Sequence, residues 1–260
     1  MWLSLIFCMF WFLANYTYNF GLTRTSVSSS TVLSDTSSIF VYLIGLVLLR
    51  DKFSWVKAAF VLVSFCGVVV ITLEDNKQAE GEDAQDHSFL GDVFSLLSAV
   101  FYAIYATYLK LKVPEDREAT FKFSYFLGFV GLFNIFLLFP LFFIFDATGI
   151  ETFEWPNGKT LLFLTLNAFI GTFISDYCWV RSAVLLGPLI TTLGISLTIP
   201  LSLVSSAFFD DISFSWMYLG GSFMILTSFV VIAYMDYLNE EKKKRNKLKE
   251  KSLEPFQDEK

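Results

Sequence analysis

The sequence predicts an all-α integral membrane protein with about eight transmembrane helices. Hydrophobic residues make up 55% of the 260 positions, and 31 of the residues are Phe. The mean hydropathy is +0.57, above the range of soluble globular domains. Apolar stretches of membrane-spanning length follow one another along the chain, and one pattern within them occurs twice. Together these observations predict helices that face lipid and are related by an internal repeat.

The predicted spans follow from the length that a helix needs to cross a bilayer, about 20 apolar residues for a hydrocarbon core of about 30 Å. The first segment lacks a basic leader and is too long for a signal peptide, so we interpret it as a span. Residues 74–88 form an acidic loop, and the charged tail begins at residue 238. The predicted spans are 2–20, 26–49, 55–73, 89–111, 121–145, 161–183, 188–209 and 214–237.

The basic residues predict the orientation of these spans. With the C-terminal tail in the cytosol, alternation places 16 Lys and Arg residues on the cytosolic side and 3 on the other, which account for all 19. Basic residues favour the cytosolic side of membrane proteins. We therefore expect both termini in the cytosol, as an even number of spans requires.

The repeated pattern relates the two halves of the chain. Phe-Ser-Trp at 53–55 and Val-Val-Ile at 69–71 recur at 214–216 and 230–232, an offset of 161 (214 − 53). The two copies lie five predicted spans apart, so equivalent helices cross the membrane in opposite directions. An inverted repeat of this kind is typical of secondary transporters, whose sites lie near the midplane between the repeats.

Several short motifs resemble the drug/metabolite transporter superfamily (EamA-like). They are Asn-Tyr-Thr-Tyr at 15–18, Leu-Thr-Arg-Thr-Ser at 22–26, Arg-Asp-Lys-Phe-Ser-Trp at 50–55 and Gly-Asp-Val at 91–93. The strongest resemblance is to solute carrier family 35, subfamily F, and its fungal vacuolar-membrane relatives, over residues 1–237. It implies a ten-helix fold of two inverted five-helix repeats, here incomplete.

This resemblance and the repeat divide the chain into four parts. Residues 1–73 match the last three helices of the first repeat, and 74–88 form an acidic lumenal loop. Residues 89–237 form a complete second repeat, and 238–260 a basic, charged cytosolic tail. Two helices of the first repeat are therefore expected to be absent at the N-terminus. This predicts a fragment, an alternative product or a wrongly assigned start, and leaves open whether the chain transports anything by itself.

Polar residues at membrane depth are the candidate site residues, because charge there is costly and usually faces a cavity or a partner helix. Asp176 lies near the middle of its span, and the offset pairs it with Asn15. It is either a carboxylate that contacts solute or carries a proton, or an acid that packs against neighbouring helices. The adjacent residues Tyr16 and Tyr177 are also paired by the offset, and they either contact solute or pack.

A second group of candidates lies on a Ser- and Thr-rich span. Asp35 continues a polar stripe with Ser28, Thr31 and Ser38 at helical spacing. The stripe is either a cavity wall or a small-residue face that lets helices approach closely. Thr191 and Thr192 occupy the corresponding region of a later span, where the same two interpretations apply.

The function that these features favour is transport of a small-molecule solute by a secondary transporter. A membrane enzyme is disfavoured because the chain has one His, His87, in an acidic loop, and no residue set for catalysis, zinc or phosphate binding. A non-transporting or regulatory truncated protein stays the alternative. No cofactor or metal is expected, and the net charge of −6 gives no reason to expect nucleic acid. The expected partners are a solute and the lipid bilayer, a homo-oligomer stays open, and the expected location is an endomembrane (Golgi or vacuolar/lysosomal).

Overall fold

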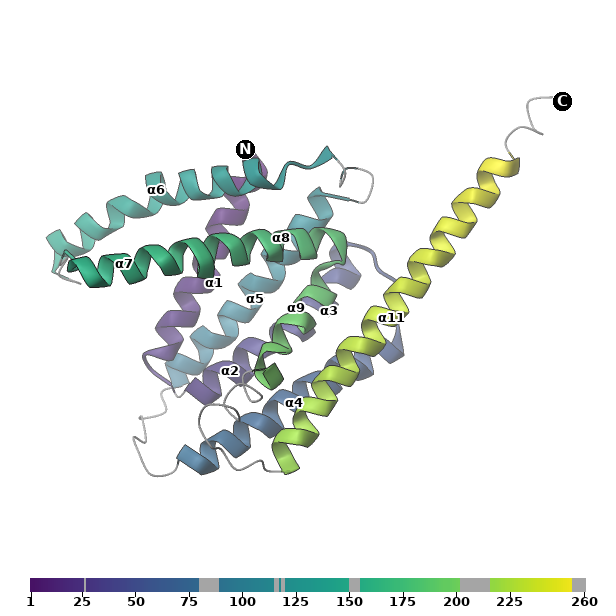
Figure 1. Ribbon diagram of the computed structural model, residues 1–260, viewed down its shortest axis with the longest axis horizontal. Coiled ribbons are helices and arrows are strands. Elements are labelled where there is room, and N and C mark those ends of the chain that lie inside the picture. Colours follow the sequence, from purple (N-terminus) through teal and green to yellow (C-terminus); the bar gives the residue numbers. More distant parts are fainter. Residues whose placement is uncertain are drawn as a thin grey trace.

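The computed structural model describes residues 1–25, 27–79, 89–114, 117, 120–149, 155–201 and 216–253. Every regular element within these ranges is a helix. Most of the long helices lie side by side in one bundle, and α6 and the α7–α8 segment run together across one side of it (Figure 1). The elements are α1 (Trp2–Leu22), α2 (Val27–Asp35), α3 (Ser37–Leu48), α4 (Trp55–Ala79), α5 (Phe89–Lys112), α6 (Phe123–Thr148), α7 (Gly158–Leu166), the π-helical turn η2 (Asn167–Ile174), α8 (Ser175–Leu185), α9 (Pro188–Ser196) and α11 (Trp216–Leu253).

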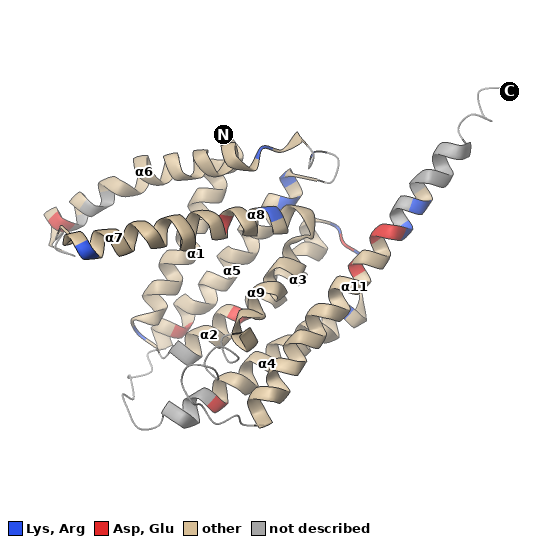
Figure 2. Cartoon of the chain, in the orientation of Figure 1, with Lys and Arg blue, Asp and Glu red and all other residues tan. Residues whose placement is uncertain are grey.

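Within the described ranges, 7 helices are long and apolar enough to cross a membrane. They correspond to the first six predicted spans and the eighth, so the prediction of an all-α membrane protein is confirmed. The predicted span 188–209 is described only as far as residue 201, and its helix Pro188–Leu201 is apolar but shorter. Most Lys and Arg residues lie toward the helix ends, whereas an acidic residue lies midway along the α7–α8 segment (Figure 2). Neither α7 nor η2 contains a buried residue, which is consistent with Phe-rich faces in contact with lipid.

Two helix breaks fall at positions that the repeat offset relates. Residue Thr36 separates α2 from α3, and α9 ends at Ser196. Helices α2 and α9 thus end 161 positions apart, at Asp35 and Ser196 (196 − 35). These two helix breaks therefore follow the offset found in the sequence.

Helices α4 and α11 run in opposite directions and pack closely along their length (Figure 1). Their closest approach is made by two glycines. A Cβ atom on Gly67 would lie 2.8 Å from the carbonyl oxygen of Gly221, and one on Gly221 would lie 2.7 Å from that of Gly67. Small residues allow membrane helices to approach in this way. The two copies of the repeated pattern thus contact one another directly.

Two of the short motifs also meet, where the α1–α2 connection packs against the start of α5. The Asp92 carboxylate accepts hydrogen bonds from Thr25 Oγ1 at 2.7 Å and Ser29 Oγ at 3.1 Å. A Cβ atom on Gly91 would lie 2.9 Å from Thr25, so only glycine allows this approach. The Leu-Thr-Arg-Thr-Ser and Gly-Asp-Val motifs are therefore two sides of one contact.

Helices α4 and α11 both extend beyond the ends of the spans that the sequence predicts. Helix α4 continues to Ala79, into the predicted acidic loop, and the rest of that loop, including His87, lies outside the described residues. Helix α11 continues without a break to Leu253, so the predicted tail begins as an extension of the last span. Residues 254–260 lie outside the described part of the chain.

Candidate solute cavity

A cavity of about 960 Å³ lies between the helices of the two predicted repeats. Asn15 on α1 and Asp35 on α2 line it from the N-terminal half, and Tyr102 on α5, Asp176 on α8 and Thr191 on α9 from the C-terminal half. No Lys, Arg or His is among the described residues that line it. The two acids consequently make its charge negative or, when protonated, neutral.

Asp35 lies where α2 ends, opposite the end of α9. Its Oδ1 accepts a hydrogen bond from Ser196 Oγ at 2.5 Å, and Ser38 Oγ donates to the Asp35 backbone carbonyl at 2.9 Å. Asp35 and Ser196 are 161 positions apart, the offset of the repeat. A residue that contacts its own repeat equivalent must lie close to the axis that relates the two repeats.

Asp176 lies in the first turn of α8, directly after the π-helical turn η2. The helix therefore changes its hydrogen-bonding register next to the acid, a feature that is frequent at functional sites. A Cβ atom on Gly171, within η2, would lie 2.5 Å from Asn167 Oδ1, so the Asn167 side chain occupies the space beside this glycine. The carboxylate is half-buried and lines the cavity.

Three helices are joined by hydrogen bonds at Tyr102 in the cavity wall. Trp179 Nε1 donates to Tyr102 Oη at 3.0 Å. Thr192 Oγ1 lies 3.3 Å from the same oxygen and 2.7 Å from the carbonyl oxygen of Pro188. The rings of Tyr102, Tyr105 and Trp179 also meet edge to face, with centroids 5.1–5.8 Å apart. The result is a fixed aromatic wall with its polar groups satisfied.

Hydrogen bonds to backbone carbonyls at the start of α9 hold its two threonines in place. Thr191 Oγ1 donates to the Gly187 carbonyl at 2.9 Å and lies 2.8 Å from Ser182 Oγ. Gly187 precedes α9 with a φ of 94°, a conformation that glycine adopts readily. This glycine allows the chain to turn sharply from α8 into α9, so that both helices contribute to the cavity.

Five of the seven predicted site residues line this cavity, namely Asn15, Asp35, Asp176, Thr191 and Thr192. The two predicted tyrosines do not. Tyr16 is 48% exposed and its ring stacks between Phe12 and Phe20. Tyr177 lies with its ring centroid 6.4 Å from that of Phe123. The placement of these two side chains favours packing, and the role of all seven residues stays a prediction.

Sequence reasoning missed Tyr102, Trp179 and Ser196. Tyr102 and Trp179 are aromatic residues in apolar helices, and their type alone does not separate a cavity wall from a lipid-facing surface. Ser196 could have been found from the repeat, because it lies 161 positions after Asp35.

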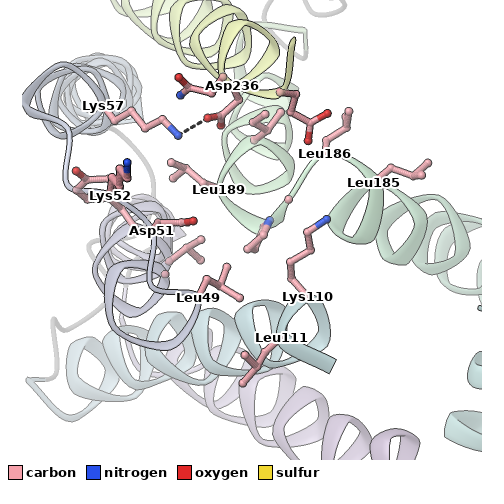
Figure 3. Close-up of a pocket in the computed structure, with 18 of the residues that line it drawn as sticks. Leu49, Asp51, Lys52, Lys57, Lys110, Leu111, Leu185, Leu186, Leu189 and Asp236 are labelled. Carbon is pink, nitrogen blue, oxygen red and sulfur yellow. Dashed lines mark hydrogen bonds and ion pairs between the residues drawn. The ribbon is translucent and has the colours of Figure 1, made fainter. Parts of the chain in front are cut away.

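A second cavity of about 620 Å³ lies at the end of the bundle that the basic residues predict to be cytosolic (Figure 3). Charged residues of both signs line it, including Lys52, Lys110 and Asp51. It shares Leu186 and Ile190 with the larger cavity, so the two cavities adjoin at the α8–α9 region. We call this second cavity the vestibule.

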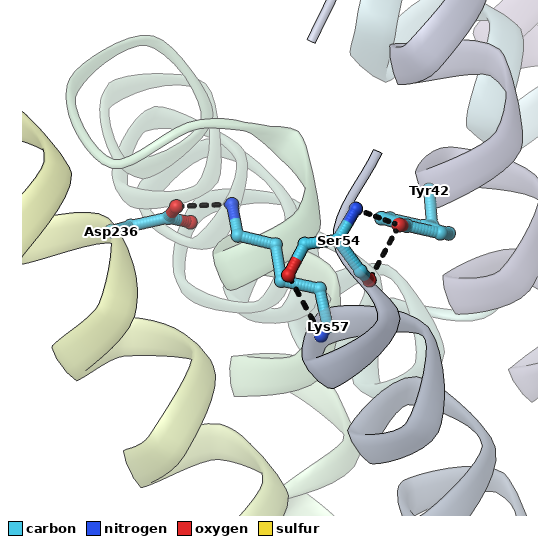
Figure 4. A network of polar contacts seen from close by, with 4 residues as sticks. All are labelled: Tyr42, Ser54, Lys57 and Asp236. Atoms are coloured by element: carbon cyan, nitrogen blue, oxygen red, sulfur yellow. Dashed lines mark hydrogen bonds and ion pairs between the residues drawn. The ribbon is translucent and has the colours of Figure 1, made fainter. Parts of the chain in front are cut away.

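One side of the vestibule is fixed by the start of α4 (Figure 4). Tyr42 Oη donates to the Ser54 carbonyl at 3.0 Å and accepts from the Ser54 amide at 3.1 Å. Ser54 Oγ in turn accepts from the Lys57 amide at 3.4 Å, as a helix-capping side chain does. The Lys57 ammonium then forms an ion pair with Asp236 on α11. The start of α4 is thereby joined to the far end of the α11 span.

The long apolar helices define a multi-pass α-helical membrane protein. A solved crystal structure has a similar fold, with a TM-score of 0.62 at 17% identity over 92% of this chain and 77% of that chain.

Residues 1–244 match the sequence profile SLC35F, solute carrier family 35, and the chain belongs to this family. It is 38% identical over 240 residues to mouse solute carrier family 35 member F5, covering 91% of this chain and 44% of that protein. It is 35% identical over 240 residues to an uncharacterised vacuolar membrane protein of Saccharomyces cerevisiae (88% and 60% covered). It is 36% identical over 231 residues to a thiamine-repressible mitochondrial transport protein of the same yeast (88% and 62% covered). The chain thus spans about half the length of the curated relatives it matches first.

Proposed function

We propose that the chain is part of a secondary transporter that moves a small-molecule solute by alternating access, with the larger cavity as the solute site. The observation that carries the proposal is the cavity itself, in which helices of both predicted repeats bring two acids to membrane depth. Membership of a solute carrier family supports it. In this proposal residues 1–73 supply three helices of the first repeat and residues 89–237 the whole second repeat.

The lining of the cavity favours a neutral or cationic solute. Recognition of a diphosphate favours Lys or Arg, and the described lining residues include neither. Asp35 and Asp176 instead attract positive charge, and the rings of Tyr102 and Trp179 in the cavity lining can contact an organic cation or a flat ring. We place the vestibule and both termini in the cytosol, and the protein in an endomembrane such as the Golgi or the vacuole.

Tryptophan fluorescence offers a direct test, because Trp11 and Trp179 both line the cavity. The purified chain would be titrated with a nucleoside, an organic ammonium ion and a nucleoside diphosphate sugar. We expect quenching by the nucleoside or the ammonium ion and none by the diphosphate sugar. For the ammonium ion, Asp176→Asn should weaken binding at least about tenfold, or about 1.4 kcal/mol. Asn15→Ala should have a smaller effect, because it leaves the acid in place.

Uptake of the bound solute into vesicles then separates transport from binding. Trp216→Phe serves as the optical control, since this exposed side chain lies outside the cavity lining and its loss should change neither the quenching by solute nor the uptake. Tight binding of the diphosphate sugar alone would refute the assigned solute class. Binding without uptake would favour the non-transporting or regulatory alternative.

A further inference from the structure

The Asp35 carboxylate has one oxygen that the described structure leaves without a hydrogen-bond partner. Oδ1 accepts from Ser196, whereas Oδ2 is buried and no described group donates to it. Unpaired buried carboxylate oxygens are costly, and at membrane depth they mark functional positions. The hydrogen bond from Ser196 therefore satisfies only one of the two carboxylate oxygens of Asp35.

The side chains around Asp35 add no positive charge. The other titratable side chains that line the same cavity are Tyr18 on α1, Tyr102 and Tyr105 on α5, and Asp176 and Cys178 on α8, none of which is a cation. An ionised Asp35 would therefore have no cation among these side chains to balance its charge, which favours the uptake of a positive ion.

The burial of Oδ2 decides which positive ion fits. A hydrated metal ion or the ammonium group of a solute needs space beside the oxygen, and this atom is enclosed. A proton needs no such space. It forms an O–H bond at Oδ2 when it arrives from water on one side, and that bond breaks when the proton leaves to water on the other side.

We propose that Asp35 is a proton-binding site where the ends of α2 and α9 meet, and that its proton is coupled to solute movement. The coupling rests on the proposed transport function, whereas proton binding does not. Because Asp35 contacts its own repeat equivalent, small relative movements of the two repeats act directly on this contact. Asp146 is the matched control, being an exposed acid on α6 that lines neither cavity.

The test uses the purified chain in phosphatidylcholine vesicles adsorbed to a solid-supported membrane. A pH step in the absence of solute should displace charge transiently, because a proton enters a buried position. We expect the signal of Asp35→Asn to fall well below that of the wild-type chain, and Asp146→Asn and Asp35→Glu to retain it. Size-exclusion profiles and melting curves confirm that each variant is folded. If Asp35→Asn does not fold, a retained signal in Asp35→Glu and Asp146→Asn, with its loss in folded Asp35→Ser, supports the same assignment.

A wild-type chain without a transient, an unchanged Asp35→Asn signal, or a loss confined to Asp176→Asn would each overturn the proposal. The fluorescence titration on the same preparations separates this outcome from failure of the proposed function. Solute binding without a proton transient leaves the solute site intact and removes Asp35 as a proton site. A proton transient without solute binding supports Asp35 as a proton site and removes the proposed solute site.

Discussion

Replacing Gly221 by alanine should push α4 and α11 apart. The new Cβ would lie 2.6 Å from Ile71 Cγ1 and 2.7 Å from the carbonyl oxygen of Gly67. An ordinary carbon–oxygen contact is about 3.3–3.6 Å, so the helix axes must separate locally by about 0.6–0.9 Å. The obstructing oxygen belongs to a helix backbone and cannot rotate away as a side chain would.

The magnitude follows from comparison with the neighbouring glycine. A Cβ atom on Gly220 would meet nothing within 4 Å, so Gly220→Ala gains the helix propensity of alanine without a clash. Gly221→Ala gains the same propensity, and its difference from Gly220→Ala is therefore the overpacking cost, about 1–3 kcal/mol. Equilibrium unfolding of both variants in mixed micelles measures this difference. Equal stability of the two would show that α4 and α11 are not in contact at this position.

The other two predictions concern the α1–α5 contact and the orientation of the chain. Asp92→Ala removes the acceptor of Thr25 and Ser29 and should lower the free energy of unfolding by about 1.5–3 kcal/mol. Asp92→Asn keeps one oxygen and should lose less, and wild-type stability in both variants would contradict the hydrogen bonds. Lys159→Cys and Asn246→Cys, both at exposed positions, should react with a membrane-impermeant maleimide from opposite sides of the membrane. Reaction from the same side would rule out the proposed orientation and the number of spans between them.

The sequence was sufficient to predict the helices because a bilayer imposes a simple length rule on apolar segments. It also predicted that the copies around Trp55 and Trp216 are related, because their spacing matches over a long interval. The break at Thr36 was not predicted, because neither proline nor glycine lies there to signal it. The break after Ser196 has a local cause in the sequence, because Pro200 has no N–H to donate to the Ser196 carbonyl four residues earlier.

The cavity was predicted in part for an equally physical reason. Acids such as Asp35 and Asp176 are easy to recognise in an apolar helix. A carboxyl group at membrane depth is energetically unfavourable unless it faces a cavity or a polar partner. Tyr102 and Trp179 are compatible with lipid, with a core and with a cavity, and only the arrangement of α5, α8 and α9 separates these cases. The same ambiguity explains why Tyr16 and Tyr177 were grouped with the polar residues beside them.

The contact between Asp35 and Ser196 bears on how such a chain could arise by duplication. In an ancestor built from two identical copies, a residue on the symmetry axis would face its own counterpart. Two aspartates there would share one proton or repel each other, and two serines would carry no charge. Joining the copies in one chain lets the two positions change independently. An acid opposite a hydroxyl can therefore occur in a fused chain, whereas it cannot occur on the axis of a symmetric dimer of identical copies.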